Sequence, residues 1–587
     1  MSRLATTAVA LFVSFLGLAL VPAAQAKKIA AYPSPGVKVA SPTTQISFRG
    51  IKPGALGRIS VRGSRSGIHR GRVEAHSDGR GASFLPFKPF QTQERVTVYS
   101  RSNIFYGTGR HRYSFATGQI VPKSWRAEPQ VPARGATPPD WTSYKTFRYK
   151  VPDISIKTSS PAANDGLIFL APRTNGPMIV DREGNLVYYD PGLRITDFRV
   201  QRFRGKPVLT WWRRAQIGNK VASFYTILNR NYKVIKQFHA GNGYTSDPHE
   251  FTMAGRNTAF VNGFRTVVMD LRRFGGLKRT PVMDNVAQEI DLKTGLVMWE
   301  WHSIGNVRIN ETYMKIPRRI TRPFDYFHLN SIERDKDGNM LLSARHARAL
   351  YKVNRLTGKI MWRMAGKKSD FKIGKGMYFA YQHDFRREPD GTYSLFDNGA
   401  GGPALPRVSK RSKGIIFRIN QKKRTTTLVQ SFYHPEGILS NSQGNTQVLP
   451  DGNVFVGWGD KKTCTEYNRR GNVLFDLWYS AQQVSYRCYS DPWVGTPPAS
   501  QIAVRSMAAG DHSRVWVSWN GDTRVATWRV LAGNPGRLAY AGQTRRDGFE
   551  TTLPVDGHPA QFRLIGLDAS GKVIGRSKLN KLGQLTN

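Results

Sequence analysis

The segments EIDLKTGLVMWEW (Glu289–Trp301) and KVNRLTGKIMWRM (Lys352–Met364) decide the fold, because they are two copies of one repeated pattern. In each copy an apolar strand ends at a polar pivot residue, a short turn rich in Gly, Lys or Arg follows, and a second strand begins. Asp and Asn bond their own backbone and tolerate the left-handed conformation, and Gly supplies positive φ, so each copy predicts a β-hairpin. Six copies occur, with their pivots at Asp181, Asn229, Asp291, Asn354, Asn420 and Asn468.

The pivots lie 48 to 66 residues apart, and a repeat of this size made of short strands is typical of a β-propeller. Almost no segment shows helical periodicity, so we expect an all-β fold. Six copies predict a six-bladed β-propeller over residues 150–498. Function is then expected on the central axis, where the innermost strand of each blade converges.

The regions on either side of the repeats also predict strands. Residues 27–121 contain alternating segments such as TQISFRG and RVTVYSR, which favour an N-terminal β-sandwich. Residues 122–149 are Pro-rich and predict a semi-rigid linker. Residues 499–587 predict a C-terminal β-sandwich that resembles a fibronectin type III module.

The first 26 residues have the layout of a secretory signal peptide. An apolar run from Ala8 to Val21 precedes Ala24-Gln25-Ala26, and it is short for a membrane span, which needs about 20 residues. We therefore expect a secreted protein, or one in the periplasm or at the cell envelope. In such an oxidising compartment Cys464 and Cys488 either form one disulfide within the last blade or stay as thiols; the sequence leaves this open.

The chain is strongly basic, with a net charge of +48 from 88 Lys and Arg against 40 Asp and Glu. These basic residues are scattered over every segment, and no run of five or six occurs, so a nucleic-acid partner is not expected. The pattern favours a solvated basic surface with electrostatic association to an anionic cell envelope. Attraction of small anionic substrates is the alternative.

Three imidazoles fall at matched places in successive repeats. His383 lies seven residues before Asp390, His328 lies two residues before Asn330, which is itself seven before Asp337, and His249 takes the equivalent position one repeat earlier. Alternation along a strand predicts that His328 and Asn330 point to one face. Arg345 ends the second strand of the repeat that holds His328, so it can reach the same axial funnel.

A cluster of donors with no accompanying carboxylates suits an anionic group, which Arg holds with a bidentate fork. Neutral His is also a nucleophile that can form a covalent intermediate. These residues therefore suggest transfer of an anionic group through a His adduct. Two alternatives stay open: ordinary surface or core histidines, and a three-His metal site, which the fixed charge of Arg345 disfavours.

Five segments of the repeat region stand out together: DPHEF (247–251), FDYFHLNSI (324–332), LLSARHARALYKVNRLTGKIMWRMAG (341–366), FAYQHDFRREPDGTYSLFDNG (379–399) and SQGNTQVLPDGNVFVGWG (442–459). As a set they resemble the bacterial arylsulfotransferase family over roughly residues 150–495. The resemblance implies a six-bladed propeller that moves a sulfuryl group from a phenolic sulfate ester to a phenol acceptor, with neither the nucleotide sulfate donor nor a metal as cofactor.

The same resemblance carries roles to individual residues. It makes His383 the nucleophile that is sulfated in a ping-pong reaction, and it gives sulfuryl binding and acid/base roles to His249, His328 and Arg345, with Asn330 beside them. Phe379 and Tyr381, just before His383, are candidates for an aromatic substrate pocket or for blade packing. The closely spaced cysteine pair of well-studied members is absent, and the C-terminal module is an addition.

Two other functions remain as alternatives. The segments DLKTGLVMWEW and NRLTGKIMWRM resemble the tryptophan-docking repeat of quinoprotein dehydrogenases, which carry pyrroloquinoline quinone on a propeller that usually has eight blades. Six repeats, and the absence of adjacent cysteines, disfavour this class. A non-catalytic propeller that binds partners at the cell envelope is the other alternative.

Overall fold

The described part of the chain is built from β-strands, which confirms the all-β prediction. No helix in this part is long and apolar enough to cross a membrane. Its 3-10 helices are η1 (Pro53–Ala55), η3 (Arg272–Phe274), η4 (Ile309–Glu311), η5 (Gly366–Lys368) and η6 (Ala499–Gln501). The expected signal peptide and most of the Pro-rich stretch lie outside the described residues of this computed structural model, which are 29–104, 111–121, 140–172, 175–217, 220–320, 322–400 and 407–586.

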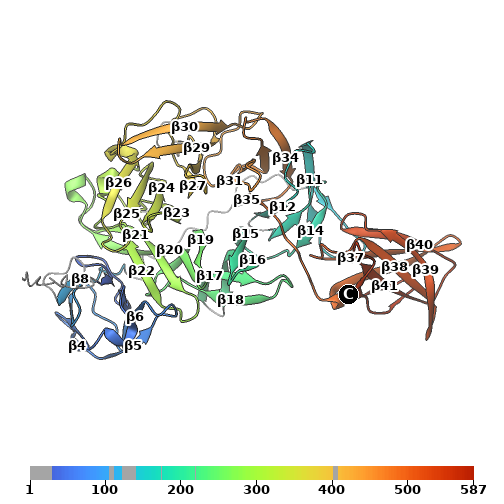
Figure 1. Cartoon of the computed structure of the whole chain (residues 1–587), viewed down its shortest axis with the longest axis horizontal. Helices are drawn as coiled ribbons and strands as arrows, with labels where there is room; N and C mark the ends of the chain where they lie inside the picture. Colours follow the sequence, from blue (N-terminus) through green and yellow to red (C-terminus); the bar gives the residue numbers. More distant parts are fainter. Residues whose placement is uncertain are drawn as a thin grey trace, which may run out of the picture.

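Within these residues, six antiparallel sheets form the middle of the chain and surround a common centre (Figure 1). The first three are β12 (Leu167–Pro172), β13 (Met178–Val180), β14 (Leu186–Tyr189) with β35 (Ser485–Asp491); β15 (Ile195–Phe203), β16 (Lys206–Ile217), β17 (Lys220–Leu228), β18 (Val234–Phe238); and β19 (Thr245–Gly255), β20 (Thr258–Met269), β21 (Thr280–Asp291), β22 (Val297–His302). The other three are β23 (Leu329–Arg334), β24 (Met340–Ala344), β25 (Ala349–Val353), β26 (Ile360–Ala365); β27 (His383–Arg387), β28 (Tyr393–Asp397), β29 (Lys413–Asn420), β30 (Thr425–Phe432); and β31 (Asn445–Val448), β32 (Val454–Gly457), β33 (Thr463–Tyr467), β34 (Val473–Tyr479) with β11 (Ile154–Ser159). Strands β15, β19, β23, β27, β31 and β35 face the centre.

The six pivot residues all occupy the turn between the third and fourth strands of their sheets, as the repeat predicts. Each pivot side chain accepts backbone N–H bonds within its own turn; Asn229, for example, accepts from Asn231 and Lys233 at 3.0 Å each. The expected left-handed residue is not the pivot itself, however. It lies three or four positions later, at Gly184, Tyr232, Gly295, Gly358, Arg424 and Gly471. The pivot therefore acts through its side chain, and the later residue makes the reversal.

Two strand pairings between the beginning and the end of this region close the ring. The late strand β35 pairs with the early strand β12, with Phe169 opposite Tyr489. The early strand β11 pairs with the late strand β34. Cys464 on β33 and Cys488 on β35 form a disulfide with Cα atoms 6.4 Å apart. The expectation that a bridge would lie within the last blade is wrong, because β35 belongs to the sheet of β12 and the bridge joins two sheets.

Two pairs of sheets flank the ring, one at each end of the chain. The N-terminal pair is β1 (Ala30–Tyr32), β2 (Ile46–Arg49), β6 (Gly81–Pro86), β5 (Gly71–Ala75) and β4 (Gly67–His69), β3 (Ile59–Gly63), β7 (Arg95–Ser100), β8 (Arg112–Ala116). The C-terminal pair is β40 (Glu550–Asp556), β37 (His512–Trp519), β36 (Ile502–Ala509), β44 (Leu585–Thr586) and β39 (Arg537–Arg545), β38 (Thr527–Asn534), β41 (Gln561–Leu567), β42 (Val573–Arg576), with β43 (Asn580–Lys581) beside β41. Each pair encloses its own buried apolar cluster. Strands β9 (Trp141–Thr142) and β10 (Val151–Pro152) pair with each other.

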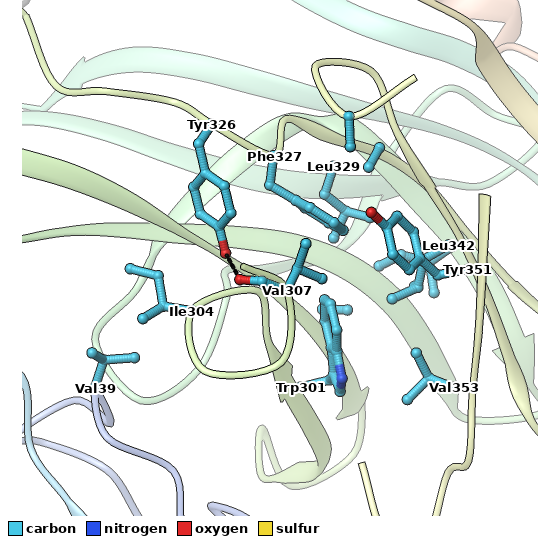
Figure 2. Packing of buried hydrophobic residues seen from close by; sticks show 14 of the residues in the cluster. Val39, Trp301, Ile304, Val307, Tyr326, Phe327, Leu329, Leu342, Tyr351 and Val353 are labelled. Carbon is cyan, nitrogen blue, oxygen red and sulfur yellow. Dashed lines mark hydrogen bonds between the residues drawn. The ribbon is translucent and has the colours of Figure 1, made fainter. Parts of the chain in front are cut away.

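One large apolar cluster joins the N-terminal sheets to the ring and anchors part of the centre (Figure 2). Val39 lies at its N-terminal side, and Trp301 and Tyr351 lie between neighbouring sheets. Phe327 and Leu329, which flank His328, are both buried in it. Burying two such side chains stabilises by about 1.5–3 kcal/mol each, so the backbone at residue 328 is held on both sides.

Candidate active site

Three histidines from successive innermost strands lie together at one end of these strands. His249 is on β19, His328 directly precedes β23, and His383 begins β27. The rings of His249 and His328 are 4.6 Å apart between centroids. Tyr486 on β35 joins the group, with its ring centroid 5.6 Å from His249 and 6.2 Å from His383.

The backbone around these rings is locally irregular. His328, Tyr381, Asp384 and Gln443 all have φ between 57° and 68°, a region that non-glycine residues rarely adopt. The innermost strands also lose regular register next to the site, between Leu329 and Ser331 and between His383 and Arg386. Such bulges re-aim side chains and are frequent beside active sites.

His383 is buried and hydrogen-bonded at both ring nitrogens. Its Nδ1 lies 2.7 Å from Asn398 Oδ1. The orientation of the Asn398 amide is fixed, because its Nδ2 donates to the carbonyls of Ser440 and Gln443. Asn398 Oδ1 must therefore accept a hydrogen bond from Nδ1–H of His383. The Nε2 atom then carries the lone pair, and it accepts a bond from the backbone N–H of Gln443 at 3.2 Å.

Several effects keep His383 neutral. Burial lowers the pKa of His383 well below its usual range, and the positive charge of Arg345 lowers it further. The bond to Asn398 acts in the opposite direction but does not reverse the shift. A neutral imidazole whose tautomer leaves Nε2 unprotonated is the form that a histidine nucleophile needs.

The other two histidines each have a carboxylate partner. Nδ1 of His249 lies 2.6 Å from Asp247, and Nδ1 of His328 lies 2.5 Å from Asp325. From the sequence we expected no carboxylates at this site, and that expectation is wrong. Burial nevertheless lowers the pKa of His328 in spite of Asp325. Each carboxylate thus orients its ring through Nδ1.

Arg345 contacts the same cluster through a histidine that follows it in the chain. Its Nη1 lies 3.1 Å from Nε2 of His346, whose Nδ1 is 2.6 Å from the carbonyl oxygen of Asp325. The guanidinium of Arg345 also stacks over Tyr381 at 4.2 Å from the ring centroid. The ring of His346 is 4.5 Å from that of His328, so Arg345, His346 and His328 form one continuous group.

Asn330 and Phe379, two of the residues expected to bind substrate, contact other parts of the fold instead. Asn330 is fully buried, and its amide donates to the carbonyl of Gln382 at 2.6 Å. The left-handed backbone at His328 and the bulge at Asn330 break the regular alternation that would place both on one face. Phe379 lies in an apolar cluster with Trp362 and Phe385, whereas Tyr381 contacts Arg345.

Besides the two aspartates, four residues of this site were not predicted from the sequence. Asn398 directly follows β28, and Gln443 lies in the loop before β31, so neither is at the position where the repeats were compared. His346 was not considered, although it directly follows Arg345. Tyr486 belongs to the innermost strand of the first sheet, but the last segment of the ring, β35, supplies that strand. Only knowledge of the ring closure by β35 identifies it as an axial residue.

A buried network of charges lies next to the cluster and ties four innermost strands together. Arg487, the neighbour of Tyr486, is 2.9 Å from Asp197, 3.5 Å from Glu250 and 3.4 Å from Asp384. Arg386 adds contacts of 2.6 Å to Glu250 and 2.7 Å to Asp384. Removing one member of such a network leaves an uncompensated charge, which costs about 3–5 kcal/mol. The network therefore holds the strands that carry the site.

Among the described residues, Asp325, His328 and His346 offer ligand atoms within 4.8 Å of one another. These three side chains are therefore the candidate ligands for a metal ion in this part of the chain. Asp325 already holds His328, and the guanidinium of Arg345 lies against Nε2 of His346. A fixed positive charge at that distance opposes a second cation, so the arrangement suits an anion better than a metal.

Comparison with known families identifies the segment that holds this cluster. Residues 199–480 match the family model described as Arylsulfotransferase (ASST). The match confirms the resemblance inferred from the five sequence segments. It includes His249, His328, Arg345 and His383, while Tyr486 lies just beyond its end. No curated protein matches the chain.

Solved structures give only weak likenesses. A protein of unknown function from Bacteroides caccae is 10% identical with a TM-score of 0.34, covering 55% of this chain and 98% of its own. A virginiamycin B lyase from Staphylococcus aureus is 9% identical with a TM-score of 0.28, covering 63% and 97%. A protein from Lactobacillus plantarum is 12% identical with a TM-score of 0.30, covering 66% and 99%. Likenesses of this size carry no argument about function.

Proposed function

We propose, starting from the match of residues 199–480 to the arylsulfotransferase family model, that this protein transfers a sulfuryl group from a phenolic sulfate ester to a phenol. We further propose that the transfer is ping-pong and passes through a sulfated His383. The observation that carries this proposal is the state of His383, which is buried, neutral and held by Asn398 in the tautomer that leaves Nε2 unprotonated.

In the first half-reaction the Nε2 lone pair of His383 attacks the ester sulfur. A nitrogen–sulfur bond forms as the sulfur–oxygen bond to the aryl group breaks, and the electron pair leaves with the phenolate. In its imidazolium form, His328 or His249, each oriented by its aspartate, donates its Nε2 proton to that phenolate. Arg345 holds the sulfuryl oxygens as charge redistributes.

In the second half-reaction the acceptor phenol attacks the sulfur of the adduct. The nitrogen–sulfur bond breaks, its electron pair returns to Nε2 of His383, and the phenolic proton passes to the imidazole that gave one up earlier. Atoms and charges balance over the cycle without a redox partner. Tyr381, stacked on Arg345, is placed to line the aryl side of the substrate.

Three further features belong to this proposal. The six sheets act as blades of a propeller whose axis holds the site, flanked by two β-sandwich modules. The protein acts outside the cytoplasm, after removal of residues 1–26. Its disulfide between Cys464 and Cys488 is compatible with an oxidising compartment.

The test is to trap the intermediate. The full chain is incubated with nitrophenyl sulfate without acceptor, digested, and examined by mass spectrometry for a sulfuryl group on the peptide that contains His383. We expect one burst of nitrophenol per enzyme, with loss of both adduct and burst in His383→Ala. His512→Ala, in the C-terminal sheets, is the matched control. Near-full transfer by His383→Ala would show that the sulfuryl group takes another route.

A further inference from the structure

The end of the N-terminal sheets farthest from the ring carries an unusual patch of exposed apolar side chains. Ile68 on β4 is 75% exposed, and Phe87, just after β6, is 63% exposed. Among the large hydrophobic side chains of the described residues that lack a polar group, these two are the most exposed. Figure 1 shows β4 and β5 at the outer end of this module, away from the ring.

A backbone hydrogen bond brings together the two segments that carry these side chains. The backbone N–H of Phe87 donates to the carbonyl of Arg70 at 2.9 Å, so Phe87 lies opposite a residue two positions from Ile68. His69, between them, is buried and bonded to the carbonyl of Lys88 at 3.2 Å. Arg70 links β4 to β5 and is exposed, as is Ile68, whereas His69 between these two residues is buried. Ile68, Arg70 and Phe87 are thus exposed on adjoining segments of this module.

Exposed cations surround the patch. Arg62 is the cross-strand partner of Ile68, Arg70 lies beside Phe87, and Lys88 follows Phe87 in the chain. The nearby acids are already engaged: Glu74 pairs with Arg72 at 2.5 Å, and buried Glu94 accepts bonds from Arg65 and Ser66. Two protruding apolar groups inside a ring of positive charge form a surface complementary to an anionic lipid bilayer.

We propose that this patch, defined as Ile68 and Phe87 with Arg62, Arg70 and Lys88, docks the protein on an anionic membrane surface. The apolar side chains enter the interface between headgroups and acyl chains, and the three cations contact lipid phosphates. Burial of the Phe87 and Ile68 side chains at this depth adds a hydrophobic contribution to the binding free energy. Binding of free phosphate or of a dissolved polyanion has no such contribution. This docking is independent of the reaction at the ring, because the patch lies on the opposite side of the N-terminal module.

The first experiment measures co-sedimentation of the full chain with vesicles. Vesicles that contain phosphatidylglycerol should bind it, and pure phosphatidylcholine vesicles should bind it at least about tenfold more weakly. Ile68→Ser/Phe87→Ser and Arg70→Glu/Lys88→Glu should each reduce binding to anionic vesicles by about tenfold or more. The matched controls, Tyr540→Ser and Arg537→Glu on the C-terminal strand β39, should bind as the parent does.

A second readout separates insertion from simple charge attraction. The two native cysteines are joined in a disulfide, so an environment-sensitive dye on Phe87→Cys reports on that position alone. Its emission should shift to the blue with anionic vesicles and should not shift with soluble polyanions. Circular dichroism and the unfolding midpoint confirm that each variant is folded.

Three outcomes would overturn the proposal. Equal loss of binding in the control variants would mean that the overall charge of +48, rather than this patch, holds the protein on the vesicle. A dye that stays in water while binding persists would exclude insertion. Concentration-dependent self-association that Phe87→Ser abolishes, without vesicle binding, would assign the patch to a second copy of the chain.

Discussion

The backbone N–H of Gln443 donates to Nε2 of His383 at 3.2 Å, so the lone pair proposed to attack sulfur is occupied in this state. Gln443 has a left-handed φ of 68°, which costs of order 1–3 kcal/mol for a residue other than glycine. The loop must therefore move away from His383 before the reaction begins. Asn398 stays in place on the other nitrogen and keeps the tautomer.

The role of Asn398 can be tested directly. Asn398→Ala removes the acceptor for Nδ1 of His383, so the ring can take the other tautomer and Nε2 loses its lone pair part of the time. We expect kcat for nitrophenyl sulfate to fall by about 10- to 100-fold. Tyr378→Ala, at a residue that is 66% exposed, is the control. Unchanged kcat in Asn398→Ala would mean that the tautomer is set by something else.

The acid side of the pH profile should reflect the lowered pKa of His383. Because that pKa lies well below 6.5, the neutral nucleophile persists into the acid range, and the rate falls only as pH drops through the lowered value. With a good leaving group, which needs little protonation, kcat/KM should thus stay flat well below pH 6.5. Asn398→Asp places a carboxylate on Nδ1 and should move the acid limb upward. A parent profile that already falls near 6.5 would contradict the assignment.

His346 is predicted to act through Arg345. Its pKa is lowered to about 3, chiefly by burial, so Nε2 remains an acceptor for the Arg345 guanidinium at working pH. Arg345→Ala should slow transfer by about 10²–10³. His346→Phe keeps an aromatic ring against His328 but removes the acceptor, and we expect about a tenfold loss in kcat/KM.

A double-mutant cycle separates positioning from packing. If His346 works by orienting Arg345, then His346→Phe should have almost no further effect in the Arg345→Ala background. Additive losses would instead mean that His346 acts on its own. His512→Phe is the matched control, and it should leave kcat/KM unchanged in both backgrounds.

The hairpins and the matched histidine positions could be predicted from short stretches of the sequence. The pivots predict the hairpins because Asp and Asn side chains satisfy the turn backbone without any tertiary contact. The matched His positions follow from the repeat, since equivalent residues of successive sheets meet at the centre. The segment Tyr326–Asn330 is an example, because the buried side chains of Phe327 and Leu329 fix the position of His328 between them.

The remainder depends on contacts between distant segments. Asp325 lies outside the strand and reaches His328 where the backbone has a left-handed φ of 57°, and no alternation rule predicts that turn. Tyr486 comes from β35, the last strand of the ring, which closes it by pairing with the early strand β12. The same closure explains why the disulfide joins two sheets rather than two strands of one blade.

A stability prediction concerns a histidine outside the site. His302 is fully buried, with Nδ1 2.6 Å from Asp284 and Nε2 3.0 Å from Glu300. Although burial alone would lower it, these carboxylates raise the pKa of His302 to about 10. The charged form therefore contributes stability that is fully present below pH 6.5 and is lost as pH rises through about 10.

Replacing His302 leaves two buried carboxylates without their cation. His302→Leu should lower the free energy of unfolding by about 3–5 kcal/mol near neutral pH. The difference from the parent should shrink as pH approaches 10, because the parent loses the same charge. Exposed His239→Leu serves as the control. Urea denaturation at a series of pH values measures both effects, and a pH-independent difference would argue for packing instead.

The last prediction concerns the bridge between Cys464 on β33 and Cys488 on β35, which closes a loop of 24 residues. A cross-link over a loop of this length stabilises by about 3 kcal/mol. Reductant, or Cys464→Ala/Cys488→Ala, should lower the unfolding midpoint accordingly, and reductant should not affect the double variant. Because β35 also carries Tyr486, two residues from Cys488, a loosened closure should reduce transferase activity at denaturant concentrations where the intrinsic fluorescence of the ring is still native. Activity and fluorescence that decline together, in the oxidised and the reduced protein alike, would show that the bridge supports the whole ring rather than the site-bearing strand.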